Sequence, residues 1–260
     1  MTTSIPDVVG LGAVLRSAGF VAAEREAEVL LAHASGDRAV FGAALARRLG
    51  GEPLAWIVGE TMFFGATVSV RAGVYVPRRQ SESLVRRAIE LLPRGGTAVD
   101  VCTGTGAIAR AIGRARPDAT VVASDIDPRA VACARANGVE AFVGDLLEPV
   151  PAGLRGRVDL VVGVVPYVPS AAMSLLQRDT LAFESGVSYD GGDDGVDILR
   201  RVVAEGTRYL RHGGSLLLEL GADQAGLIAS DLERAGYSPA VVLLDDDRDP
   251  RGIETTFTGS

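Results

Sequence analysis

The spacing of apolar residues changes once along the chain, near residue 60. Before that point apolar side chains recur every three or four residues, which predicts helices in VVGLGAVLRSAGF, AAEREAEVLLAHASG and AVFGAALARRLGG. We expect these helices to pack together as a small helical cap over residues 1–60. From Thr61 the pattern becomes short alternating runs, TMFFGATVSV and GVYVP, with glycines between them, which is typical of a β-hairpin. We expect residues 61–76 to link the cap to the rest of the chain.

The remaining residues, 77–260, alternate between apolar strands and amphipathic helices. A helix in SESLVRRAIELLP comes first, and the strands are TAVDV, TVVASD, EAFVGD, DLVVGV and GSLLLEL, with helices such as GAIARAIGRA and PRAVACARANG between them. This alternation predicts an α/β domain with a parallel sheet covered on both faces. The final segment, YSPAVVLLDDDRDPRGIETTFTGS, predicts two strands around an acidic loop, which form an antiparallel hairpin at the sheet edge.

Composition and charge exclude several classes of protein. The chain has 260 residues, 47% of them hydrophobic, and can bury a full core. No apolar run reaches the roughly 18 residues of a membrane span. The N-terminus, MTTSIPDVVG, lacks a basic region followed by an apolar block, so we expect a cytoplasmic protein. The net charge of −7 and scattered arginines argue against direct nucleic-acid binding and favour a protein or small-molecule partner.

Individual residue types narrow the chemistry further. All 26 basic residues are arginine, which excludes a lysine Schiff base and a phosphate-binding P-loop. Cys102 and Cys133 lie far from His33 and His212 in sequence, so neither a metal site nor a disulfide framework is predicted. The chain has no Gly-x-Ser-x-Gly, the nucleophile motif of one hydrolase class.

A glycine loop follows the first strand of the predicted sheet. In DVCTGTGAIA, Gly104, Gly106 and Ala109 match the Gly-x-Gly-x-x-Gly/Ala pattern of nucleotide-binding loops. Asp125 ends the next strand, where a carboxylate can accept hydrogen bonds from ribose hydroxyls. These features are common to sites for NAD and for S-adenosylmethionine.

Two further carboxylates favour S-adenosylmethionine. Asp100, four residues before Gly104, either holds the loop or meets the ammonium group of a methionine moiety. Asp145 follows the third strand, where it can accept from an adenine amino group, with Leu146 against the ring. The alternative is that these aspartates, with Asp125, are helix caps or turn residues. Because sheet ligands bind outside the carboxyl ends of the strands, a shared binding site is the preferred interpretation.

Several segments together resemble a known family. EPLAWIVGETMFFGATVSVRAGVYVPRRQSESLV precedes the glycine loop, and VVPYVP, FESGVSYDGGDDGVDILRRV and GGSLLLELG follow it. Their order and spacing resemble class I S-adenosylmethionine methyltransferases, and within them the protein-(glutamine-N5) methyltransferases that modify peptide-chain release factors. The similarity covers nearly the whole chain and implies a doubly wound, mostly parallel seven-stranded sheet. By this resemblance the cofactor-binding residues are Arg78, Asp100, Thr103, Gly104, Gly106, Asp125, Ile126, Asp145, Leu146 and Val164.

The resemblance also implies the residues around the transferred methyl group, which are Val164, Pro166, Tyr167, Phe63 and Glu184. Phe63, or its neighbour Phe64, has an alternative role in the hairpin core. For Glu184 the alternative is a structural carboxylate paired with an arginine.

The turn after DLVVG departs from the family pattern. The family has Asn-Pro-Pro-Tyr, or Asn-Ala-Pro-Tyr, where this chain has Val164-Val165-Pro166-Tyr167. In the family the asparagine side chain and the next carbonyl accept hydrogen bonds from the target amide. Valine cannot accept, and the loss of one buried partner costs roughly 1–3 kcal/mol.

Three functions follow, in order of preference. The first is an S-adenosylmethionine-dependent methyltransferase with an unidentified acceptor, a small molecule or a protein side chain. The second is glutamine methylation of a release factor, with a backbone carbonyl of the turn as the only acceptor for the amide. The third is a protein that binds the cofactor without turning it over, and a dehydrogenase ranks last. The sequence indicates no oligomeric state.

Overall fold

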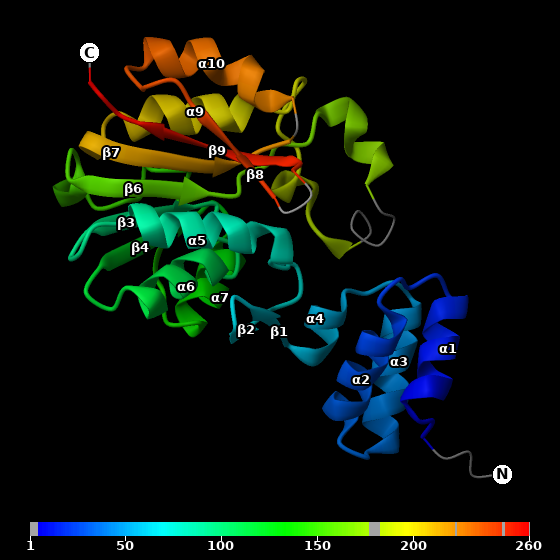
Figure 1. Cartoon of the computed structure of the whole chain (residues 1–260). Helices are drawn as coiled ribbons and strands as arrows, with labels where there is room; N and C mark the ends of the chain where they lie inside the picture. Colours follow the sequence, from blue (N-terminus) through cyan, green and yellow to red (C-terminus); the bar gives the residue numbers. More distant parts are fainter. Residues whose placement is uncertain (1–4, 177–182, 222, 246–247, 260) are drawn as a thin grey trace.

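The computed structural model describes residues 5–176, 183–221, 223–245 and 248–259 (Figure 1). The predicted N-terminal helices are α1 (Val8–Ser17), α2 (Ala23–Ala34) and α3 (Arg38–Leu49). Asp7 and Asp37 cap the first and third, because their carboxylates accept hydrogen bonds from main-chain nitrogens of the first turn. The helices enclose a core of their own, which includes Leu11, Leu15, Leu30, Phe41 and Ile57.

A short helix and a hairpin connect this bundle to the sheet. They are α4 (Leu54–Val58), β1 (Glu60–Phe63) and β2 (Ala66–Ser69), with β1 and β2 antiparallel. The expectation that GVYVP forms part of the hairpin was wrong, because both strands lie between Glu60 and Ser69, before that stretch. Val74 is instead buried in a loop, where its carbonyl accepts a hydrogen bond from Trp56 Nε1 at 2.9 Å.

The rest of the chain forms the predicted mostly parallel sheet of seven strands. The strands, in chain order, are β3 (Thr97–Val101), β4 (Thr120–Asp125), β5 (Glu140–Val143), β6 (Val158–Gly163), β7 (Leu210–Glu219), β8 (Val241–Leu244) and β9 (Pro250–Thr256). Their order across the sheet is β5-β4-β3-β6-β7-β9-β8. The antiparallel hairpin lies at the sheet edge as predicted, and the last strand is inserted beside β7.

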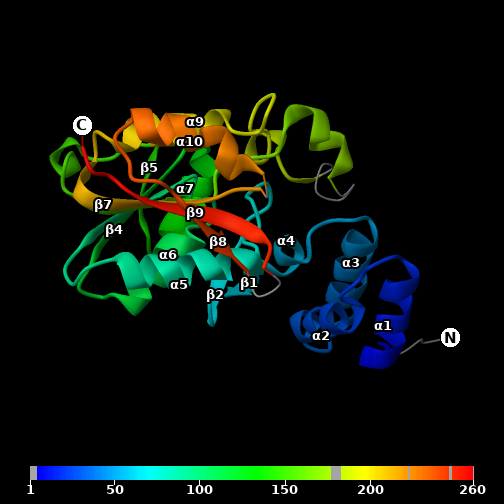
Figure 2. The same cartoon turned by 45° about the horizontal axis from the view of Figure 1, so that its top comes forward.

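Helices cover both faces of this sheet (Figures 1 and 2). One face packs against α5 (Glu82–Leu91), α6 (Ala107–Ala115) and α7 (Pro128–Ala136), and the other against α9 (Asp197–Gly206) and α10 (Gln224–Arg234). Short 3₁₀ helices occur at Arg79–Ser81, Ala152–Leu154, Ser170–Leu175 and Gly186–Ser188. Within the described ranges, no helix has the length and apolar character needed to span a membrane.

The strand order reverses between β3 and β6, which are neighbours in the sheet although β4 and β5 follow β3 in the chain. Connections from these two strands leave toward opposite faces, so a crevice forms outside their carboxyl ends. Ligands of doubly wound sheets bind at this point. The glycine loop follows β3 and the Val164 turn follows β6, so the fold brings the two together.

Candidate active site

A cavity of about 1110 Å³ opens at the carboxyl ends of the strands. Most of the residues expected in the site line it, namely Arg78, Gly104, Asp125, Ile126, Asp145, Leu146, Val164, Pro166 and Tyr167. A smaller cavity of about 40 Å³ is lined by Phe63, Arg78, Asp100, Thr103, Gly104 and Val164, among others. Gly106 and Glu184 line neither of these two cavities in the part of the chain that the structure describes.

The glycine loop turns sharply because alternate residues adopt left-handed backbone conformations. Gly104 has φ 55° and Gly106 has φ 78°, values that favour glycine. A Cβ on Gly106 would lie 2.9 Å from the Cβ of Ala134, so this glycine allows α6 to pack closely on α7. Gly106 therefore shapes the loop from behind the cavity.

Asp100 lies at the base of this loop and is buried. Its Oδ2 accepts hydrogen bonds from Thr103 Oγ1 at 2.6 Å and from the nitrogen of Ala109 at 3.1 Å. Its Oδ1 is also buried and has no hydrogen-bond partner among the described residues. Burial raises the pKa of this carboxyl to about 7. One oxygen thus holds the loop, and the other has no partner among the described residues.

Asp125 joins the end of β4 to the glycine loop. Its Oδ2 accepts from the nitrogen of Gly104 at 2.8 Å, and its Oδ1 accepts from the nitrogen of Asp127 at 2.9 Å. Burial raises its pKa, and the hydrogen bonds from Asp127 and Gly104 oppose that rise. Each carboxylate oxygen retains a second lone pair for a ligand hydroxyl.

At the end of β5, Asp145 forms an ion pair that the sequence analysis missed. Its Oδ2 lies 2.7 Å from Arg201 Nη2, and Arg201, on α9, lines the same cavity. No local sequence signal links two residues so far apart in the chain. Leu146, the next residue, is buried with φ 47° and lies against the cavity.

The turn after β6 presents apolar side chains and one tyrosine. Val164 lines both cavities, and Val165 is buried in the core. The hydroxyl of Tyr167 donates to Glu219 Oε1 at 3.1 Å, and Ser81 donates to the other oxygen at 2.6 Å. Burial raises the pKa of Tyr167, so its hydroxyl stays protonated near neutral pH. No pattern in the sequence predicted a role for Glu219.

Glu184 forms the arginine pair that was one of its two expected roles. Its Oε2 lies 2.9 Å from Arg78 Nη2 and accepts a hydrogen bond from Tyr189, and its Oε1 accepts from the nitrogen of Val76 at 3.3 Å. The guanidinium of Arg78 also lies 5.1 Å from the ring centroid of Tyr75. Glu184 thus supports an arginine and two tyrosines that line the cavity.

Phe63 occupies the hairpin core, the alternative role considered for it. Its side chain is buried against α5 and α6 and reaches only the smaller of the two cavities described above. Phe64 lines a separate hollow between the hairpin and α6. The aromatic walls of the larger cavity are instead Tyr75, Tyr167 and Tyr189. Among the described residues, no group of histidine, cysteine and carboxylate side chains is arranged to hold a metal ion.

Known proteins similar to this chain decide its family. It is 34% identical over 221 residues to the release factor glutamine methyltransferase of Geobacter sulfurreducens, covering 83% of this chain and 75% of that one. It is 35% identical over 257 residues to the protein of the same name from Cereibacter sphaeroides, covering 90% and 92%. The chain belongs to the release factor glutamine methyltransferase family.

Two further comparisons agree with this family. The family model for the methyltransferase small domain matches residues 68–162, which contain β3, the glycine loop, β4, β5 and all but the last residue of β6. A solved methyltransferase from Pyrococcus furiosus shares the fold, with a TM-score of 0.54 and 19% identity over 84% of this chain and all of that one. This member of the release factor glutamine methyltransferase family is thus an S-adenosylmethionine-dependent methyltransferase with a class I fold.

Proposed function

We propose that this methyltransferase acts on an acceptor other than a release-factor glutamine. The observation that carries the proposal is Val164, which lines both cavities at the position where the turn meets the glycine loop. Its side chain can neither donate nor accept a hydrogen bond. The residue next to the methyl-transfer position therefore offers no side-chain partner to an amide.

The residues of the glycine loop fit S-adenosylmethionine. Asp100 has a buried oxygen without a partner in the described ranges, beside the smaller cavity, and an ammonium group placed there offsets the cost of burying the charge. Asp125 would hold the ribose hydroxyls from the end of β4, and Ile126 and Leu146 would cover the adenine ring. When bound, this cofactor supplies an electrophilic methyl group on a sulfonium.

The acceptor cavity favours a nucleophile other than an amide nitrogen. An amide nitrogen is a poor nucleophile because its lone pair is delocalised into the carbonyl. Holding its N–H groups to hydrogen-bond acceptors localises that pair, and Val164 removes one such acceptor. An amine, hydroxyl or carboxylate needs no such partner, so we assign the acceptor to this class.

The walls of the cavity indicate the shape of the acceptor. Tyr75 and Tyr189 contact edge to face, with ring centroids 5.6 Å apart, and Met173 and Leu176 add apolar surface. These walls suit a planar or apolar group, on a small molecule or on a protein side chain. The hydroxyl of Tyr167 is occupied by Glu219, so it positions the acceptor rather than removing its proton.

Glutamine of a release factor is the second candidate. The names of the relatives favour it, since the relatives described above are release factor glutamine methyltransferases. In that case a main-chain carbonyl of Val164 or Val165 is the only acceptor that the turn offers to the amide.

The test supplies the protein with S-adenosylmethionine labelled in its methyl group. One reaction contains an intact release factor with its Gly-Gly-Gln sequence, and others contain the small-molecule and protein fractions of a cell extract. We expect label in a fraction outside the release factor. Stoichiometric methylglutamine in the release factor would establish the second candidate. Cofactor binding without S-adenosylhomocysteine in any reaction would exclude both and leave a binding protein.

A further inference from the structure

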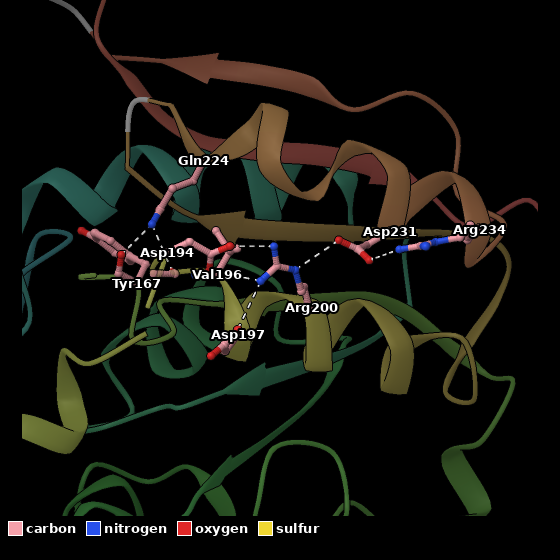
Figure 3. A network of polar contacts seen from close by, with 9 residues as sticks. Tyr167, Asp194, Val196, Asp197, Arg200, Gln224, Asp231 and Arg234 are labelled. Carbon is pink, nitrogen blue, oxygen red and sulfur yellow. Dashed lines mark hydrogen bonds and ion pairs between the residues drawn. The ribbon is translucent and has the colours of Figure 1, made fainter. Parts of the chain in front are cut away.

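One buried amide joins three segments behind the turn that follows β6. Gln224 is the first residue of α10 and is buried. Its Nε2 donates to the main-chain oxygen of Tyr167 at 2.7 Å and to that of Gly195 at 3.1 Å. Its Oε1 accepts from the nitrogen of Gly221 at 2.7 Å. Figure 3 shows this amide reaching from the start of α10 to the backbone of Tyr167.

Gly195 provides the space that this junction needs, because it has no side chain. It has φ 78°, and a Cβ there would lie 2.5 Å from Gln224 Nε2 and 2.6 Å from the oxygen of Tyr167. A side chain at this position would force the two apart. The glycine therefore allows a close approach of three polar groups rather than only a turn of the chain.

The segment that contains Gly195 is also tied to α10 by an ion-pair network. Arg200, on α9, lies 2.7 Å from Asp194 and 3.3 Å from Asp231 of α10 (Figure 3). The segment around Gly195 is thus held at two points of α10, by Gln224 in its first turn and, through Arg200, by Asp231 in its second half. This leaves the position of Tyr167 fixed by a rigid helix rather than by a loop alone.

Main-chain hydrogen bonds also join the residues after Tyr167 to residues just before Gly195 in the chain. The nitrogen of Val168 donates to the oxygen of Tyr189 at 2.8 Å, and the nitrogen of Ser170 donates to that of Gly192 at 2.9 Å. Val164 and Val165 add no polar side chain that could hold the turn. The amide of Gln224 is therefore the direct polar link from helix α10 to the turn.

We propose that Gln224 is a positioning residue, which sets where the turn Val164–Tyr167 lies at the wall of the cavity by holding the carbonyl of Tyr167. The inference rests on the proposed function in one respect, because that function gives this turn the task of holding the acceptor. Gln224 itself is outside the residues that line the larger cavity in the described part of the chain. Its effect on methyl transfer is exerted through Tyr167.

The first test needs no acceptor. Gln224→Met keeps the length of the side chain and removes the amide, and Glu233→Met is the matched control at an exposed position of the same helix. Hydrogen–deuterium exchange is compared for the peptide that covers residues 165–176. We expect this peptide to exchange roughly tenfold faster in Gln224→Met, because the turn opens more easily without the hydrogen bond from Gln224. The control should match the wild type.

The second test separates positioning from a general loss of structure. With any acceptor that the wild type methylates, kcat of Gln224→Met should fall on the order of 10- to 100-fold through misplacement of the turn. The Kd for S-adenosylmethionine should stay within about twofold, because Val164 is the single proposed cofactor residue in this turn and the others lie on other segments. Gly195→Ala disturbs the same junction. The fold-decrease in kcat of the double variant should therefore be smaller than the product of the fold-decreases in the two single variants.

The outcomes remain distinct from those of the proposed function. Equal exchange rates in Gln224→Met, the control and the wild type would overturn the inference, whatever the acceptor. Equal losses of cofactor affinity and kcat would also overturn it, since they indicate a general structural role. A wild type that methylates no acceptor would refute the proposed function, and the exchange comparison would still decide the role of Gln224.

Discussion

The carboxylate of Asp125 accepts a hydrogen bond from the main-chain nitrogen of Gly104 at 2.8 Å, which joins the end of β4 to the glycine loop that follows β3. The two residues are 21 positions apart in the chain. Parallel strands that are neighbours in the sheet place them at the same edge. This bond holds the glycine loop against the end of β4 at the proposed cofactor site.

Replacing Asp125 with alanine should weaken the binding of S-adenosylmethionine. The variant loses the acceptor for Gly104 and the proposed partner of the ribose, and hydrogen bonds to a charged group contribute about 1.5–3 kcal/mol each. We expect Kd to rise by roughly tenfold or more, measured by isothermal titration calorimetry. Asp118→Ala is the control, because Asp118 also accepts from a glycine nitrogen, Gly95, at 2.7 Å, near the opposite end of β4. Equal affinities in the two variants would place the cofactor elsewhere.

Asp100 should make the stability of the ligand-free protein depend on pH. Its pKa is raised to about 7 in the folded state, so the folded state binds the proton more tightly than the unfolded state. Its contribution to stability is therefore present below about pH 4 and is lost as pH rises toward 7. A shift of this size corresponds to at most about 4 kcal/mol.

Asp100→Asn isolates this contribution from those of other groups. The amide oxygen can still accept from Thr103 and Ala109, but the side chain does not titrate. Urea unfolding between pH 4 and 8 measures the difference in free energy of unfolding between the two proteins. We expect the variant to gain stability relative to the wild type as pH rises. A difference that stays constant across this range would show that Asp100 ionises normally.

Gly106→Ala should destabilise the fold more than alanine at another glycine with the same backbone conformation. At Gly106 the new Cβ meets Ala134 at 2.9 Å and Val139 at 3.0 Å. At Gly138, where φ is 82°, the new Cβ has no described atom within 4 Å. Both variants incur left-handed strain of about 1–2 kcal/mol, and overpacking adds about 1–3 kcal/mol at Gly106 alone. Denaturant unfolding of the two variants compares these losses, and equal values would contradict the packing role.

Much of the fold could be predicted from periodicity because each element buries one continuous surface. The apolar strand TAVDV and the amphipathic helix after it keep their character in any context, and both formed as expected. GVYVP alternates like a strand, but Trp56 donates to the carbonyl of Val74 and holds this segment in a loop. That contact joins residues 18 positions apart, beyond the reach of a local pattern.

The site was predictable where residues follow directly from strand ends. Gly104 and Asp125 meet because β3 and β4 are parallel neighbours. The partners of Asp145 and Tyr167 were missed, since Arg201 and Glu219 come from elements whose register the sequence does not specify. Ion pairs and buried hydrogen bonds of this kind depend on the packed tertiary structure.

The most direct measurement compares the wild type with Val164→Asn on an intact release factor, using mass spectrometry to detect methylglutamine in its Gly-Gly-Gln sequence. The variant restores a side-chain acceptor at the wall of both cavities, so we expect it to methylate the glutamine at least about tenfold faster than the wild type. Circular dichroism and cofactor affinity verify that both proteins are folded and bind S-adenosylmethionine. Efficient glutamine methylation by the wild type, unchanged in Val164→Asn, would contradict the assignment of a different acceptor.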